Sequence, residues 1–325
     1  MFYSAALPNA HRVLTHSATL QSGEHVVIVT DYEKLELGTI VATAARVITS
    51  NVNMLVMPPR DVDGEEPPET IALAMARADV VITLVARSIT HTRAVQNALK
   101  AGARAVMLTA FTPSMLLGGG IFHDFRTHRP FCQLVGRLLG EANHAHLTTP
   151  AGTDLTMDLT GRPGNPHSGV VENPGEMTTV PNSESSISPI EGSAQGIIVG
   201  DASLPYYEIG LLTEPIRMDV ENGSVTRITG GNQARRIEQM MARQNDPNVY
   251  NIAQLSFGLN PECRMQGVML EDEGVYGTSH IGIGTSSLLG GDVRAKMHFD
   301  IIMWNPTLKL DDETVLQDGV WLVDV

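Results

Sequence analysis

The architecture predicted for the first part of the chain follows from HVVIVTDYEKLELGTIVATAARVITSNVNMLVMP, residues 25–58. Its apolar runs at 25–31 and 52–58 predict buried strands, and residues 37–49 between them predict a helix. Two buried strands joined by a helix are typical of a βαβ unit with parallel strands. The alternation continues, with helices expected at 68–78 and 91–102 and strands at 79–86 and 103–111.

This pattern predicts a Rossmann-like parallel α/β domain at residues 1–145. The turn after its first strand, TDYEKLELG (30–38), lacks the G-x-G-x-x-G pattern that brings a backbone close to a dinucleotide. We therefore expect this domain to serve as a scaffold or pocket wall, with no nucleotide cofactor.

A different pattern, apolar and polar residues in alternation, begins near residue 146. It recurs in HLTTPAGTDLTMDLTG (146–161), IRMDVENGSVTRITGG (216–231) and MHFDIIMWNPTLKLDD (297–312). Period-two alternation predicts half-buried strands. The second domain, residues 146–325, is therefore expected to be β-rich, with one helix near 233–244. A segment rich in proline and glycine, 160–192, is expected to be a long functional loop without strands.

The composition limits the partners. The chain has 325 residues, a formal net charge of −14 and no cluster of Lys and Arg, which argues against nucleic acid and anionic membranes as partners. Its two cysteines cannot form a disulfide framework. We see no signal peptide and no apolar run long enough to span a membrane, so we expect a cytoplasmic protein with a small-molecule substrate.

The stretch AKMHFDIIMW, residues 295–304, contains the first candidate site residues, His298 and Asp300. Residues i and i+2 of a strand point to the same face, so imidazole and carboxylate can meet there. A buried aspartate needs a cation or a hydrogen-bonding partner. A shared metal ion and a structural His–Asp hydrogen bond are both compatible with this pattern.

Other candidates lie nearby in the second domain. His280 begins the small-residue strand SHIGIG, whose glycines leave room for a close approach, and it lies 18 residues before His298. Gln254 interrupts an apolar strand in YNIAQLSFGLNP and is a weak metal ligand. Glu176 lies in the long loop. Glu271, Asp272 and Glu273 form either a source of catalytic carboxylates or a solvated turn.

Taken together, five segments resemble the thermophilic metalloaminopeptidase family: AGTDLTMDLTGR, GEMTTVP, FGLNP, LEDEGVYGTSHIGIG and MHFDIIM followed by LDDETVLQDG. The resemblance implies an N-terminal α/β domain, a C-terminal β-rich domain with two metal ions, and a homodimer. It also implies a set of metal ligands: Glu176, His280, His298 and Asp300. Two positions depart, because the bridging glutamate of the family falls at Gln254 and its tyrosine falls at Ser287.

A second branch of this fold, the iron-dependent 2,5-dihydroxypyridine 5,6-dioxygenases, is also similar over the whole chain. NDPNVYNIAQLSFGLNP (245–261) is one of the shared segments. The resemblance implies iron held by two histidines and an aspartate, of which one pair falls at His298 and Asp300. The other histidine falls at Gln254, a pocket histidine falls at Thr179, and His280 has no counterpart.

The first hypothesis is a hydrolase that cleaves a C–N bond of a small substrate with metal-activated water. His280, His298 and Asp300 would hold Zn, Mn, Co or Fe(II), with Glu176 as a further ligand. The base would be Glu176, Glu271 or Glu273, with Gln254 bonding substrate or water. The alternative is a mononuclear non-haem Fe(II) dioxygenase that opens a hydroxylated N-heterocycle, because two histidines and one carboxylate suit such iron. A metal-free binding protein is the third possibility.

Overall fold

The computed structural model describes residues 2–90, 92–287 and 289–323. The chain forms two compact units: Met1–Arg129 with His167–Pro181 (unit 1), and Pro130–Pro166 with Asn182–Val325 (unit 2). It thus passes between the units three times, whereas the sequence predicts one passage after residue 145. Each unit has its own hydrophobic core.

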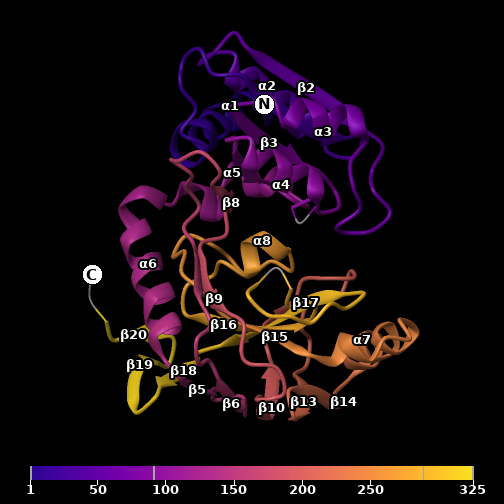
Figure 1. Cartoon of the computed structure of the whole chain (residues 1–325), viewed down its shortest axis with the longest axis vertical. Coiled ribbons are helices and arrows are strands. Elements are labelled where there is room, and N and C mark those ends of the chain that lie inside the picture. The colour runs from indigo at the N-terminus through magenta and orange to yellow at the C-terminus, as the bar shows by residue number, and fades with distance from the viewer. Residues whose placement is uncertain (1, 91, 288, 324–325) are drawn as a thin grey trace. The chain divides into compact units, whose positions relative to one another are not determined.

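Unit 1 is built on sheet A, a parallel sheet with strand order β2-β1-β3-β4-β8 (Figure 1). Every residue of β1 is buried, since this strand lies between β2 and β3. The predicted alternation of strands and helices is confirmed. The strands are β1 (Val26–Asp31), β2 (Val52–Met57), β3 (Val80–Leu84), β4 (Arg104–Met107) and β8 (Met177–Thr179), and the helices are α1 (Phe2–Arg12), α2 (Leu35–Ala45), α3 (Glu69–Met75), α4 (Arg93–Lys100) and α5 (Pro113–Leu117).

Asp31 accepts hydrogen bonds from the loop after β1 and from the loop after β3. In open α/β sheets, ligands commonly bind at the position where the strand order changes direction. The strand order changes direction at β1, which pairs with β2 on one side and β3 on the other. One oxygen of the buried Asp31 accepts the amides of Glu33 and Lys34, and the other accepts the amide of Ala86, after β3. The scaffold role of the domain stays a prediction.

Unit 2 contains two large sheets, as the β-rich prediction requires. Sheet B has the order β14-β13-β10-β6-β5-β18-β19-β20, and sheet C has the order β12-β11-β17-β16-β15-β9-β7. Their strands are β5 (His144–Thr148), β6 (Asp154–Asp158), β7 (Gly164–His167), β9 (Glu184–Ile187), β10 (Gln195–Gly200), β11 (Ser203–Leu204), β12 (Gly210–Leu211), β13 (Ile216–Glu221), β14 (Ser224–Thr229), β15 (Ile252–Gly258), β16 (Thr278–Gly284), β17 (His298–Trp304), β18 (Thr307–Leu310), β19 (Glu313–Gln317) and β20 (Val320–Trp321).

Three helices remain: α6 (Phe125–Glu141), which runs across the boundary at Arg129, α7 (Asn232–Arg243) and α8 (Met269–Asp272). The first lies at the left of Figure 1, and α7 confirms the helix expected near 233–244. Short non-α turns of helix occupy Val13–Ser17, Gly119–Phe122 and Pro247–Tyr250. None of the helices in the described part of the chain has the length and apolar character to cross a bilayer.

The expectation that residues 160–192 contain no strand is wrong. This segment supplies β7 and β9 to sheet C and β8 to sheet A. Each of the three has only three or four residues, which is too short for a period of two to emerge among prolines and glycines. Strand β9, with the sequence ESSI, is fully buried in spite of its polar residues.

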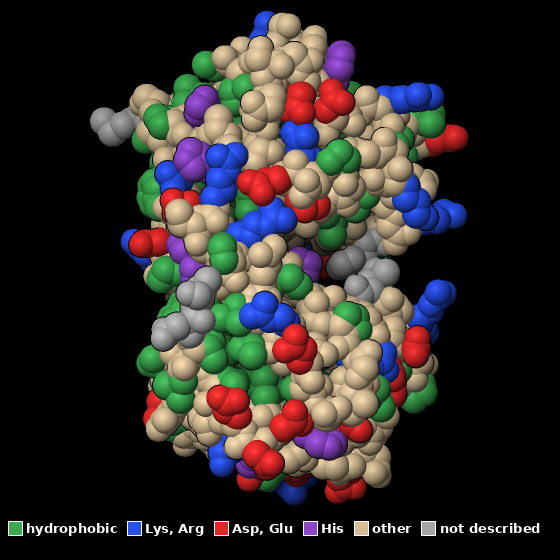
Figure 2. Space-filling model, turned by 60° about the vertical axis from the view of Figure 1, so that its left-hand side comes forward, with side chains coloured by type: hydrophobic (Ala, Val, Ile, Leu, Met, Phe, Trp, Pro, Cys, Tyr) green, Lys and Arg blue, Asp and Glu red, His purple; other side chains and the backbone are tan. Residues whose placement is uncertain are grey.

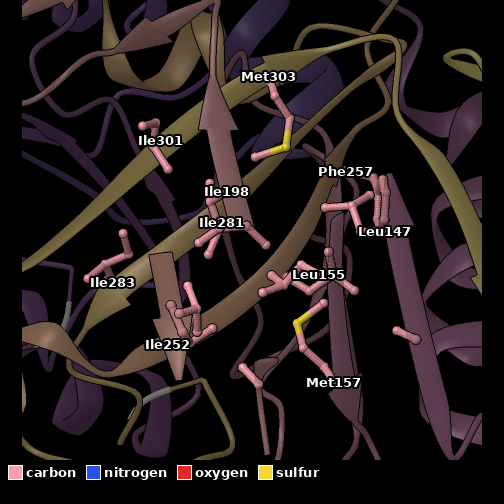
Figure 3. Close-up of a cluster of buried hydrophobic side chains, with 14 of the residues drawn as sticks. Leu147, Leu155, Met157, Ile198, Ile252, Phe257, Ile281, Ile283, Ile301 and Met303 are labelled. Atoms are coloured by element: carbon pink, nitrogen blue, oxygen red, sulfur yellow. The ribbon is translucent and has the colours of Figure 1, made fainter. Parts of the chain in front are cut away.

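The core of unit 2 combines side chains from both sheets. Strand β17 directs Phe299, Ile301 and Met303 into it, as the alternation predicts. Figure 3 shows Ile281, Ile283 and Phe257 of sheet C in the same cluster as residues of sheet B. The sheet B members of the cluster include Leu147, Leu155, Met157 and Ile198.

Replacing Phe257 by alanine tests this core. The side chain is fully buried, and its ring centroid lies 5.4 Å from that of Trp321 in an edge-to-face contact. Loss of the ring should lower the free energy of unfolding by about 3–5 kcal/mol, measured by urea denaturation. Leu322→Ala is the control, because this side chain is 55% exposed and should change stability by less than about 0.5 kcal/mol.

Candidate active site on sheet C

The predicted site residues of unit 2 gather on one face of sheet C. Strands β15, β16 and β17 are antiparallel, so residues directly opposite each other point to the same side. Because β17 sends Phe299 and Ile301 to the core, His298 and Asp300 point to the opposite face. We call this face, carrying the residues Glu184, Ser186, Gln254, Ser256, His280, Gly282, Gly284, His298 and Asp300, the polar face.

Gly282 lets three neighbouring side chains come close to the backbone of the polar face, and we call the space above it, which is smaller than a methyl group, the hollow. It pairs with Gln254 on one side and Asp300 on the other. A Cβ at Gly282 would lie 2.8 Å from Cβ of Gln254, 2.9 Å from Cε1 of His298 and 3.0 Å from Oδ1 of Asp300. The close approach to the backbone expected from the SHIGIG sequence is therefore made by these three side chains. A register shift between Ile252 and Gln254 sets the position of the amide beside the hollow.

His298 is oriented by the backbone. Its Nδ1 lies 2.9 Å from the carbonyl oxygen of Thr285, and because a carbonyl only accepts, Nδ1–H is the donor. Its Nε2 then faces Oδ2 of Asp300 at 3.5 Å. Burial disfavours the imidazolium, but Asp300 outweighs burial and raises the pKa of His298. Donation from one ring nitrogen to a carbonyl is the arrangement that fixes metal-binding histidines.

Asp300 has one oxygen in use and one without a hydrogen-bond partner. Oδ2 lies 2.7 Å from the Tyr206 hydroxyl, whereas the buried Oδ1 has no such partner within the described residues. Burial raises the pKa of a carboxyl, but His298 outweighs it and holds the pKa of Asp300 well below its usual range. A buried ionised oxygen without a partner is costly, so Oδ1 is suited to a cation.

His280 is paired with Glu184, which sequence reasoning missed. Nε2 of His280 donates to Oε2 of Glu184 at 3.0 Å, and Ser256 Oγ donates to the same oxygen at 3.0 Å. Burial opposes the imidazolium, yet Glu184 prevails and raises the pKa of His280. Nδ1 of His280 is buried and has no hydrogen-bond partner in the described chain. Glu184 comes from the long segment 160–192, whose carboxylates were the only signal for it.

The donor chemistry of the polar face fits a divalent metal ion. Among the described residues no three His, Cys, Asp or Glu side chains converge as a complete ligand group, because the side chains pair with each other. The buried Asp300 Oδ1 and His280 Nδ1 nevertheless have no hydrogen-bond partner, and the hollow at Gly282 lies beside Asp300. Imidazole with carboxylate suits iron, zinc and manganese alike.

Glu176 belongs to unit 1 and is bonded there. Its carboxylate accepts the amides of Glu172 and Asn173 and the side chain of Asn173, and it pairs with Arg129 at 3.1 Å. Burial opposes ionisation, but these hydrogen bonds outweigh it and lower the pKa of Glu176 to about 2. The structure thus brings together three of the four predicted ligands on the polar face. The role of Glu176 as a ligand stays a prediction.

The three acids after Leu270 are buried, so the solvated-turn alternative is wrong. Asp272, the last residue of α8, accepts Ser203 Oγ and the amides of Gln266 and Gly267. Glu271 accepts the amide of Arg264. Glu273 lies 2.8 Å from the hydroxyl of Tyr206. An acidic triplet usually indicates solvent exposure, and these hydrogen bonds reduce the cost of its burial.

Replacement of Gly282 by alanine tests the hollow. The new Cβ would force Gln254, His298 and Asp300 apart, so affinity for Co²⁺, a spectroscopic probe of such sites, should fall at least about tenfold in titration calorimetry. Gly118→Ala is the matched control, because its nearest neighbour would lie 3.8 Å from the added Cβ. Unchanged Co²⁺ affinity in Gly282→Ala would show that the ion binds elsewhere.

Comparison with known proteins identifies the family of this chain. The family model described as 2,5-dihydroxypyridine 5,6-dioxygenase (NicX) matches residues 7–323. The 2,5-dihydroxypyridine 5,6-dioxygenase of Pseudomonas putida is 28% identical over 258 residues, which are 76% of this chain and 71% of that protein.

Two solved structures share the fold. The 2,5-dihydroxypyridine dioxygenase of Pseudomonas putida KT2440 matches with a TM-score of 0.82 and 22% identity, covering 99% of this chain and 98% of its own. AmpT from Thermus thermophilus matches with a TM-score of 0.71 and 14% identity, covering 99% and 100%. Both branches of the resemblance are thereby confirmed at the level of the fold. The match over residues 7–323 shows that the chain belongs to the 2,5-dihydroxypyridine 5,6-dioxygenase family.

Proposed function

We propose that this protein is a mononuclear non-haem Fe(II) dioxygenase that opens the ring of a hydroxylated N-heterocycle similar to 2,5-dihydroxypyridine. The observation that carries the proposal is the oriented pair His298 and Asp300, with a free carboxylate oxygen beside the hollow at Gly282, in a member of this family. His298 and Asp300 would hold the iron, with His280 as the third donor. Iron(II) would supply the electrons that activate dioxygen, which protein side chains do not supply.

The residues around the pair would act on the substrate and its protons. Gln254, buried beside the hollow, offers an amide that both donates and accepts hydrogen bonds, as a hydroxylated ring with a nitrogen requires. Glu184, which accepts hydrogen bonds from His280 and Ser256, is a buried carboxylate behind the third donor that can hold or release a proton. The mostly buried strands beneath keep these groups in place.

The hydrolase hypothesis, first in rank from the sequence, is not confirmed. A two-metal hydrolase needs a bridging carboxylate to offset repulsion between the ions, and the amide of Gln254 cannot provide it. Glu176, the base and ligand of that hypothesis, has its carboxylate bonded to Arg129, Asn173 and two backbone amides. Family membership and the single oriented pair both favour the dioxygenase.

We expect a small-molecule substrate and, from the resemblance, a homodimer. Acidic and basic side chains are interspersed on the face of the molecule that Figure 2 shows. Together with the net charge of −14, this mixture supports the expectation that neither nucleic acid nor an anionic membrane is a partner.

Iron content and oxygen uptake test the proposed function. Protein purified without oxygen should contain about one iron per chain, and 2,5-dihydroxypyridine should stimulate oxygen uptake. His298→Ala should lose both, whereas His144→Ala, which alters an exposed histidine, should retain both. Turnover under strict anaerobiosis, or zinc with amide hydrolysis, would favour the hydrolase instead. No metal, together with a stability unaffected by chelator, would indicate a binding protein.

Replacement of Glu176 by glutamine separates the two enzyme hypotheses further. Because the ionised form is stabilised in the folded protein, its contribution is present above the ordinary pKa of glutamate and is lost as pH falls towards about 2. At neutral pH the substitution should reduce stability by about 1 kcal/mol and leave the iron content unchanged. Glu172→Gln, the other carboxylate on Arg129, is the control. Loss of metal in Glu176→Gln alone would restore Glu176 as a ligand.

A further inference from the structure

The hydroxyl of Tyr206 lies between two buried carboxyl groups. It is 2.7 Å from Oδ2 of Asp300 and 2.8 Å from Oε1 of Glu273. A phenol has one hydrogen and can donate only one of these bonds. Two ionised carboxylates cannot both be satisfied by it, so one carboxyl group must carry a proton and donate to the phenol oxygen.

Glu273 is the group that carries this proton. Asp300 has the imidazole of His298 beside it, which favours its ionised form. Glu273 is 7% exposed and directly follows another buried acid, Asp272, so an ionised carboxylate there would be a buried charge next to a like charge. No basic side chain in the described part of the chain forms an ion pair with it within 4.0 Å.

The direction of the hydrogen bonds follows from this assignment. Glu273 donates to the phenol oxygen of Tyr206, and Tyr206 donates to Oδ2 of Asp300. Since Oδ2 is thereby occupied, the oxygen of Asp300 that remains for a ligand is Oδ1, which is also the oxygen next to the hollow at Gly282.

The two segments that carry Tyr206 and Glu273 are joined at a second point. Ser203 Oγ, on β11, donates to Oδ2 of Asp272, next to Glu273, at 2.6 Å. The turn between β11 and β12 holds Tyr207 and Glu208 at positive φ, 54° and 57°, a conformation that is costly for such side chains. Two hydrogen bonds, from Ser203 to Asp272 and between Tyr206 and Glu273, therefore hold this segment against α8 and the residue after it. They fix the position of the Tyr206 hydroxyl beside Asp300.

We infer that Tyr206 and Glu273 are positioning residues that aim Oδ1 of Asp300 at the metal, and that Glu273 acts as a neutral hydrogen-bond donor. This inference rests on the proposed function, because Asp300 is a ligand there. It also replaces the hypothesis that Glu273 is a general base, since a carboxyl group that must keep its proton cannot accept one. Partners that orient a metal ligand from behind commonly change affinity 10–100-fold.

Anaerobic Fe(II) titration of the full chain, freed of metal by chelator, tests the positioning role. Tyr206→Phe should weaken Fe(II) binding about 10–100-fold, while its urea unfolding shows that it still folds. Glu273→Gln should bind Fe(II) within about threefold of wild type, because a neutral amide can still donate to the phenol. Glu273→Leu, which has no donor, should behave like Tyr206→Phe.

Tyr32→Phe is the matched control, since it removes the hydroxyl of an exposed tyrosine in unit 1 and should retain wild-type affinity. Wild-type affinity in Tyr206→Phe would overturn the positioning role. Equal weakening in Glu273→Gln and Glu273→Leu would overturn the neutral-donor role. If wild type itself binds no Fe(II), the proposed function fails, and Asp300 positioning fails with it.

Infrared spectroscopy gives a readout that needs no metal. Wild type at neutral pH should show the C=O stretching band of a protonated carboxylic acid, and Glu273→Gln should lack it. Absence of this band from the wild-type spectrum would overturn the assignment of the proton to Glu273 even where metal binding follows the expected order. The two measurements therefore separate a failure of this inference from a failure of the proposed function.

Discussion

The antiparallel register of β15, β16 and β17 determines where every group of the candidate site lies. One residue of slip would exchange the two faces of a strand, placing His298 and Asp300 in the core and Phe299 and Ile301 outside it. The free energy gained by burying the apolar side chains therefore also determines which residues lie on the polar face. For this reason a site of titratable groups can exist on mostly buried strands without loops to define it.

The polar face is stable because its charges are arranged in pairs. His298 stands beside Asp300, and His280 stands beside Glu184. Burial alone would lower the pKa of each histidine. In each pair the negative charge of the partner carboxylate outweighs burial and raises the pKa of the histidine. Removal of one partner leaves a buried charge behind, so alanine at either histidine should cost more than the loss of a ligand alone.

Local patterns in the sequence predicted the parallel sheet, the helix α7 and the shared face of His298 and Asp300, because each depends on periodicity over a few residues. Tyr206 and Glu184 could not be found this way. Tyr206 contacts Asp300, which is 94 residues away in the sequence. Glu184 pairs with His280 but lies in β9, a strand of only four residues. Asp272 and Glu273 also have partners 69 and 67 residues away, Ser203 and Tyr206, which no local pattern reports.

The residue at position 254 sets the charge next to Asp300. Gln254 and Asp300 lie on opposite sides of Gly282, which has no side chain to separate them. A carboxylate there would add negative charge beside Asp300 and favour a second cation, whereas the amide of Gln254 adds none. With Glu273 neutral as well, the ionised carboxylates on this face are Asp300 and Glu184, and with His280 and His298 neutral as ligands their two negative charges match one divalent ion. This balance of charge suits a single ion, which is what a mononuclear dioxygenase requires and a two-metal peptidase does not.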